Sequence, residues 1–266
     1  MLNGEHGESV PRTVAHPLTY SIYLRVPELL ELQIPLKVPG VHDEMLFIIV
    51  QQVQELWFKQ ILHEMHDAIG LISRNELLEA VRLITRINRI MEILGDEVDL
   101  LATMPPQQFQ HFRHVLETAS GFESHQFREL EMASGLSDPT FLKLIEKHMD
   151  VDAMRARWPQ TLHDAFLEHL RWIDADPAAA VVRIYNDPQR YAAMYTLTEA
   201  LSEYEVLFSQ WRFHHIKVVE RTLGDRALGT AGTGGAGYLG RTLGYRFFPE
   251  LWEARNRLAA GAASHA

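Results

Sequence analysis

The chain has 266 residues, a formal net charge of −10 and no cysteine. This length allows one domain with a sizeable buried core. The missing cysteines exclude disulfides and thiolate metal sites, and they fit the reducing cytoplasm, where we expect the protein. The negative charge argues against a nucleic-acid or anionic-membrane partner and favours a small-molecule ligand.

Neither a signal peptide nor a membrane span is predicted. The start of the chain lacks a basic flank followed by an apolar run. The most apolar window, MLFIIV, falls well short of the roughly 18 residues that a bilayer-spanning helix needs.

Helical periodicity dominates the chain from residue 42 onward. Apolar residues recur at steps of three and four along residues 42–72 and again along 75–104. This pattern predicts two long helices packed as an antiparallel pair. Shorter helices are predicted at residues 105–116, 121–135, 139–149 and 158–173. The segment 177–187 precedes one further long helix, predicted at about residues 189–223.

The predicted fold class is all-α, because no alternating strand run of useful length occurs in the sequence. We found no internal repeat, linker or shift of composition, so we expect a single-domain helical bundle. Its predicted bounds are 18–258, with a flexible segment at 1–17 and a disordered tail at 259–266.

Two adjacent histidines lie in the last long predicted helix, in QWRFHHIKVVERTLG. Neighbouring residues on a helix point about 100° apart. His215 therefore joins the apolar stripe of Phe208, Trp211 and Val218, whereas His214 lies with solvated residues. An inward imidazole is most often a core side chain whose nitrogens find partners, but it can also be an axial haem ligand.

Other candidate sites are weaker. His111, His114 and Glu117 share a helical face and could bind a metal, although such a face is more often simply solvated. The pair His63 and His66 does not have the spacing of the HExxH zinc motif.

The glycine-rich stretch 229–237 follows a helix, which excludes a dinucleotide fingerprint and leaves a plain connection or a closing lid. Arg113 lies among phenylalanines, so it either extends toward solvent or offers its guanidinium to a carboxylate.

Six segments in order, from about residue 18 to 255, resemble the tryptophan 2,3-dioxygenase family. They are LTYSIYL, HDEMLFII…ELWFKQILHE, FRHVL…SGFES.QFRELE, QWRFHHIKVVERTLG, GTGGAG and FFPELWEAR. Each segment alone is a weak signal, but the six together are highly specific. The resemblance implies a helical bundle around a pocket for haem b, and a homotetramer.

The implied activity is a haem-dependent oxygenase of the kynurenine pathway. O₂, the co-substrate, is inserted across the C2–C3 bond of L-tryptophan to give N-formylkynurenine. The resemblance implies that His215 binds the haem iron and that Ser120 and Trp211 contact the cofactor. Arg113 would grip the substrate carboxylate, and Thr233 would contact the amino acid from a closing loop.

The resemblance also implies that Phe47 and Phe109 line the indole pocket. Tyr20, Tyr23 and Leu24 match N-terminal residues that reach into a neighbouring subunit's pocket.

Three features depart from the family pattern. Gln51 stands where the family usually has a histidine that accepts a hydrogen bond from the indole N–H; we expect Gln51 to accept it, although an amide cannot take a proton. Phe109 stands where tyrosine is common, and the stretch 136–178 looks shorter than usual.

These departures leave two alternatives. One is a monooxygenase that converts tryptophan or a methylated tryptophan to an oxindole or hydroxyindole. The other is a non-enzymatic haem-binding sensor.

Overall fold

The computed structural model describes residues 17–117, 119–224 and 235–263. The chain divides into two compact units, residues 1–34 and 35–266. In the first unit, α1 (Tyr20–Leu24) and α2 (Val26–Leu30) meet at Arg25, which has a left-handed φ of 53°. Thr19 caps α1 by accepting a hydrogen bond from the backbone N–H of Ile22 at 3.3 Å.

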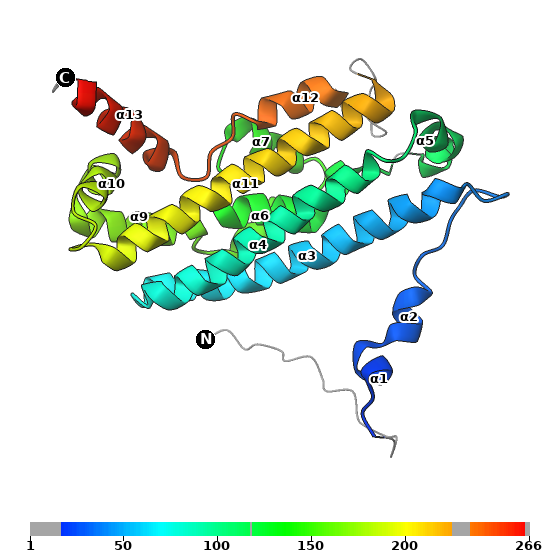
Figure 1. The fold of residues 1–266 in the computed structure, drawn as a ribbon, viewed down its shortest axis with the longest axis horizontal. Helices are drawn as coiled ribbons and strands as arrows, with labels where there is room; N and C mark the ends of the chain where they lie inside the picture. Colours follow the sequence, from blue (N-terminus) through cyan, green and yellow to red (C-terminus); the bar gives the residue numbers. More distant parts are fainter. Residues whose placement is uncertain (1–16, 118, 225–234, 264–266) are drawn as a thin grey trace. The chain divides into compact units, whose positions relative to one another are not determined.

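The second unit is built on three long helices, α3 (His42–Ser73), α4 (Leu77–Leu101) and α11 (Ala192–Leu223). α4 packs between the other two, antiparallel to α3 and parallel to α11 (Figure 1). The predicted antiparallel pair and long last helix are therefore confirmed. Ile61, Ile84 and Leu201 are fully buried at their contacts, and each such side chain contributes about 1.5–3 kcal/mol relative to an exposed one.

Shorter helices cover this framework. Their bounds are α5 (Pro106–Arg113), η1 (His114–Leu116), η2 (Gly121–Glu123), α6 (His125–Ser134), α7 (Pro139–Ile145), α8 (Val151–Arg157), α9 (Leu162–Ile173), α10 (Pro177–Asn186), α12 (Gly235–Thr242) and α13 (Pro249–Ala263). Asp138, Asp150, Thr161 and Asp176 each accept hydrogen bonds from first-turn backbone amides, which fixes where α7, α8, α9 and α10 begin.

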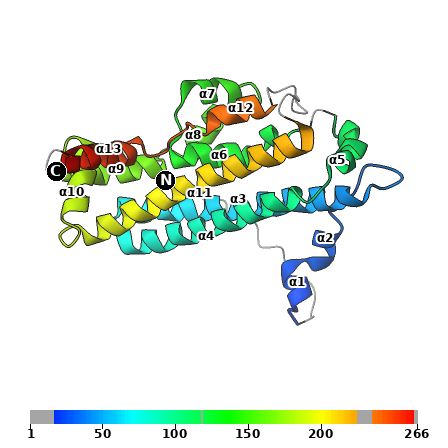
Figure 2. The same ribbon diagram turned by 45° about the horizontal axis from the view of Figure 1, so that its top comes forward.

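The covering helices pack at defined places on the framework. α6 and α9 lie against α3, and α10 packs on α13, as Figures 1 and 2 both show. α5 lies where α3 begins and α11 ends. The all-α prediction is confirmed, since the described parts of the chain hold no strand. None of the helices in those parts is long and apolar enough to cross a bilayer.

The sequence analysis did not predict the described helices α1, α2, α8, α10, α12 and α13. Of these, α1, α2, α8 and α12 have eight residues or fewer, which is too short for a clear 3.6-residue period. α13 continues to Ala263, past the predicted domain end at 258. Its alanine-rich end favours helix over a disordered tail.

Candidate active site

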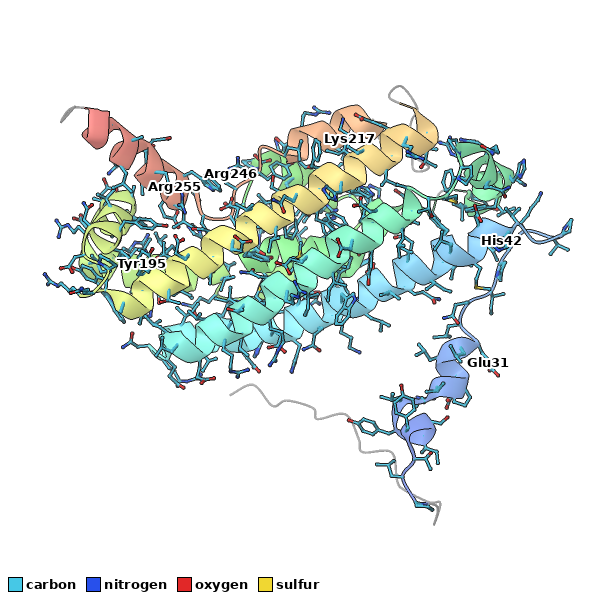
Figure 3. All side chains as sticks on the ribbon, in the orientation of Figure 1. Glu31, His42, Tyr195, Lys217, Arg246 and Arg255 are labelled. Atoms are coloured by element: carbon cyan, nitrogen blue, oxygen red, sulfur yellow. The ribbon has the colours of Figure 1, made fainter. Side chains whose placement is uncertain are left out.

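The apolar stripe predicted on α11 is confirmed. Phe208, Trp211 and Val218 are buried along it, and His215 lies between them as a partly exposed residue. Lys217, labelled in Figure 3, marks this part of α11. The contrast between the two histidines is smaller than predicted, because His214 is also only partly exposed.

The surroundings of His214 explain this difference. Its Nδ1 atom lies 3.4 Å from Asp99 Oδ1 on α4. The side chain lines a cavity of about 190 Å³ between α4 and α11, opposite Gly95. The His214 side chain therefore borders this cavity while remaining 42% exposed.

The His215 ring stacks on the Trp211 indole, with centroids 5.3 Å apart and an interplanar angle of 2°. Burial, and after it the positive charge of Arg128, lower the pKa of His215 to about 4. The imidazole is therefore neutral at neutral pH, and no residue within the described ranges hydrogen-bonds to it. A neutral imidazole with an available lone pair is a good ligand for a transition metal.

A wall of aromatic rings supports Trp211. Its ring centroid lies 4.7 Å from Phe127 on α6, 6.3 Å from Phe58 on α3 and 6.5 Å from Phe208 on α11. The Trp211 Nε1 atom is buried and has no hydrogen-bond partner in the described structure. Packing on three helices thus fixes the indole plane, and with it the plane of the His215 ring.

A second aromatic cluster joins α3 to α5. The ring of Phe47 lies 5.7 Å from Phe109 and 5.5 Å from Phe112, and the two α5 rings lie 5.2 Å apart. Leu223 of α11 packs on the same cluster, about two turns beyond His215. The fold therefore brings the predicted indole-pocket residues to the same end of α11 as His215.

Gln51 and Arg113 belong to α3 and α5, the two helices that carry this cluster. Each is partly buried, Arg113 one helical turn after Phe109 and Gln51 one turn after Phe47. Positions four residues apart share a helix face. Helical spacing thus puts each polar residue on the same face of its helix as one ring of the cluster, and their placing in a substrate pocket stays a prediction.

Ser120 acts as a helix cap. Its Oγ accepts a hydrogen bond from the Phe122 N–H at 3.3 Å, and Glu123 Oε2 accepts one from the Ser120 N–H at 3.3 Å. This reciprocal pair orders the turn between α5 and α6, the segment that connects the second aromatic cluster to the wall behind Trp211.

The remaining predicted site residues lie outside the two aromatic clusters or outside the described residues. Tyr20, Tyr23 and Leu24 belong to α1 of the first unit, where they are exposed. Thr233 lies outside the described residues. No three His, Asp or Glu side chains come together as a metal site among the described residues, which favours the solvated-face interpretation of His111, His114 and Glu117 over metal binding.

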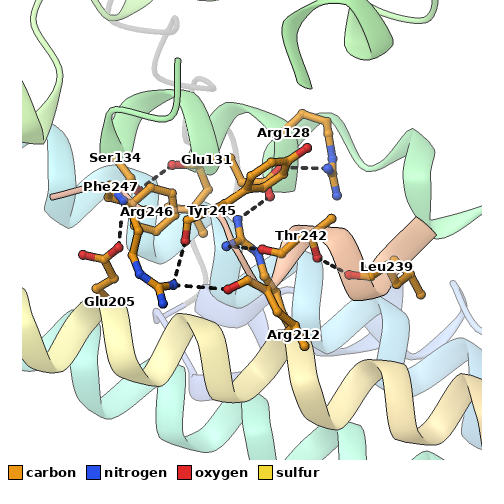
Figure 4. Close-up of polar contacts among 12 residues, drawn as sticks. Arg128, Glu131, Ser134, Glu205, Arg212, Leu239, Thr242, Tyr245, Arg246 and Phe247 are labelled. Carbon is orange, nitrogen blue, oxygen red and sulfur yellow. Dashed lines mark hydrogen bonds and ion pairs between the residues drawn. The ribbon is translucent and has the colours of Figure 1, made fainter. Parts of the chain in front are cut away.

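Sequence reasoning missed a group of buried charges on α6 and α11. Arg128, Glu131 and Arg212 are 9%, 1% and 5% exposed, and Glu131 bridges the two arginines. Figure 4 shows them together with Thr242 of α12. A signal was available, because FRELE spaces an arginine and a glutamate three residues apart on one helical face, and Arg212 interrupts an apolar stretch.

Comparison with known proteins identifies the family. A sequence profile described as tryptophan 2,3-dioxygenase matches residues 5–155 and 145–258. A protein of Nocardioides sp. named tryptophan 2,3-dioxygenase is 42% identical over 254 residues, covering 91% of this chain and 95% of that protein. One of Caulobacter vibrioides with the same name is 39% identical over 266 residues, covering 92% of this chain and 100% of its own length.

A third relative, from Pseudomonas fluorescens and again named tryptophan 2,3-dioxygenase, is 37% identical over 268 residues, with 92% of each chain covered. The alignments span nearly the whole of each relative, so this chain is close to them in length. The chain belongs to the tryptophan 2,3-dioxygenase family.

Proposed function

We propose that this protein is a haem-dependent oxygenase that inserts O₂ across the indole C2–C3 bond of L-tryptophan and forms N-formylkynurenine. The observation that carries the proposal is the neutral imidazole of His215, stacked on Trp211 in the helix whose last residue, Leu223, packs on the second aromatic cluster. Family membership supplies the substrate and the reaction.

The donor set of the described chain fits a haem. A bare catalytic ion usually needs three or more protein ligands, and no such cluster occurs among the residues described. A metal that brings its own macrocycle needs only one strong protein donor, and His215 can provide it. Trp211 and Ser120 would then contact the cofactor, the first by fixing the imidazole plane and the second through the turn that it caps.

The rest of the site binds and orients the amino acid. Arg113 would hold the substrate carboxylate through two parallel N–H···O bonds, which fix direction as well as position. Phe47 and Phe109 would pack on the indole and exclude water from it. Thr233 would contact the polar end of the substrate.

Gln51 decides what happens to the indole N–H. Its side-chain carbonyl can accept a hydrogen bond from that group, but an amide cannot remove the proton, so the proton stays on the indole nitrogen. When bound, the haem supplies O₂ binding and the transfer of oxygen to the indole ring. The protein itself would position the substrate, exclude water and provide the neutral imidazole of His215 to hold the haem.

We also propose that the protein is a homotetramer of the cytoplasm in which the N-terminal unit reaches a neighbouring subunit. Tyr20 and Tyr23 are 77% and 72% exposed, and such apolar side chains usually mark an interaction site when they gather in one place. In the family they complete a neighbouring pocket.

A second candidate is monooxygenation to an oxindole or hydroxyindole, which the amide at Gln51 favours because no side chain there can act as a base. The test is turnover of L-tryptophan with ¹⁸O₂ by the haem-loaded protein, followed by mass spectrometry. Gain of two labelled atoms without consumption of reductant supports the dioxygenase; one labelled atom with two electrons from a reductant supports the monooxygenase. No labelled product and no spectral change on adding tryptophan would contradict both and favour a sensor.

A further inference from the structure

The buried charges of α6 and α11 form a closed group. Arg128 Nη1 forms an ion pair with Glu131 Oε2 at 2.7 Å, and Arg212 Nη2 donates a hydrogen bond to Glu131 Oε1 at 2.7 Å. Arg212 Nη1 also donates to the backbone carbonyl of Thr242 at 3.3 Å (Figure 4). Each carboxylate oxygen of Glu131 thus faces one arginine, and the group holds two cations and one anion.

Two further carboxylates hydrogen-bond to backbone amides and not to these arginines. Glu205 accepts hydrogen bonds from the backbone amides of Phe247 and Phe248 at 2.9 and 3.3 Å. Asp138 accepts hydrogen bonds from first-turn amides of α7. The group of Arg128, Glu131 and Arg212 therefore holds one cation more than it has anions, in a region where an unmatched charge is costly.

Aromatic faces hold the two guanidinium groups in place. The Arg128 guanidinium lies 4.6 Å from the ring centroid of Phe127, and that of Arg212 lies 4.6 Å from the centroid of Phe208. Such contacts partly compensate a desolvated cation without neutralising it. The two guanidinium groups are therefore fixed in position and shielded from solvent.

This charge lies beside the proposed haem ligand. Arg212 precedes His215 by one turn of α11. The Phe127 ring, which lies under the Arg128 guanidinium, has its centroid 4.7 Å from that of Trp211. Trp211 in turn stacks on His215, with centroids 5.3 Å apart.

We propose that the Arg128–Glu131–Arg212 group is a positioning and tuning device for the haem iron, an inference that rests on the proposed function. Ferric haem carries one more positive charge than ferrous haem, so a fixed excess cation nearby disfavours the ferric form. The ferrous form is the one that binds O₂. A carboxylate beside an axial histidine would act in the opposite direction, by giving the imidazole anionic character.

The test is the haem reduction potential, measured by spectroelectrochemical titration of the purified holoprotein. Arg128→Met leaves Glu131 paired with Arg212 and removes the excess charge. The ferrous-to-ferric ratio at a fixed applied potential should fall about tenfold, which is a shift of 59 mV for a one-electron couple. Glu131→Gln leaves two unmatched cations and should raise the ratio. Arg128→Lys keeps the positive charge and should therefore have the wild-type reduction potential.

Two controls separate charge from damage to the fold. Arg89→Met removes a well-exposed arginine of α4 and should leave the potential unchanged. General disruption of the haem pocket would shift the potential in Arg128→Met and Glu131→Gln in the same direction. Circular dichroism and haem content confirm folding of each variant. If Glu131→Gln does not fold, the reduction potentials of Arg128→Met and Arg128→Lys still test the proposal, because only the Met variant removes the positive charge.

Equal potentials in Arg128→Met and wild type, or shifts of the same sign in the Met and Gln variants, would overturn the inference. That failure is distinct from failure of the proposed function. If the wild-type protein binds no haem through His215, the proposed function is wrong. If it does bind haem and the reduction potential does not change when these charges are altered, only the tuning role of the Arg128–Glu131–Arg212 group is wrong.

Discussion

Gly135 should be one of the least replaceable residues in the chain. It ends α6 with a φ of 115°, and its own N–H and that of Leu136 donate to the carbonyls of Met132 and Glu131 at 2.9 and 3.0 Å. A side chain in this conformation costs about 1–2 kcal/mol. A Cβ atom would also lie 2.4 Å from His163 Cβ on α9, and overpacking of this kind costs about 1–3 kcal/mol.

Gly135→Ala should therefore lower the free energy of unfolding by about 2–5 kcal/mol, measured by urea denaturation followed by circular dichroism. Gly95→Ala is the matched control. It lies inside α4 with open space around the added Cβ, so it should stabilise the protein by about 0.5–1 kcal/mol. If Gly135→Ala were as stable as wild type, or if Gly95→Ala were the more damaging change, this reasoning would be refuted.

Two further predictions concern the site and the packing of α13. Arg113→Ala should weaken tryptophan binding by about 2–5 kcal/mol in a spectroscopic titration if the carboxylate pair is buried, and an unchanged dissociation constant would exclude Arg113 as the clamp. Burial alone would lower the pKa of His163, but the hydrogen bond and charge of Glu250, at 3.1 Å, outweigh burial and raise it. The stability that this pair adds is present at acidic pH and lost as pH rises through the folded-state pKa, so the destabilisation caused by His163→Gln should be clear at pH 6 and small at pH 9; an equal loss at both values would refute the linkage.

The long helices and the composition of the site were predictable because they depend on local pattern. The stripe that carries Trp211 and His215 follows from helical spacing alone, as does the placing of Phe47 with Gln51 on one face. The convergence of α3, α5 and α11 does not follow from spacing, because it depends on how separate helices pack.

What the sequence could not predict is set by contacts across the fold. His214 borders the cavity between α4 and α11 and lies 3.4 Å from Asp99 on α4, and helical spacing does not indicate such contacts with a second helix. The bridge from Glu131 to Arg212 joins residues 81 positions apart, and no local pattern indicates such a pair. A short helix such as α8 begins at a single capping side chain, Asp150, which periodicity does not detect.

The most direct test of the account compares His215→Ala with His214→Ala for stoichiometric haem binding, using absorption spectra of reconstituted protein. The neighbouring positions share one helix and similar exposure, so general damage would affect both variants alike. We predict that His215→Ala loses stoichiometric haem and that His214→Ala retains it nearly intact. Equal losses in the two variants, or full haem retention in His215→Ala, would contradict the central claim that His215 is the axial ligand.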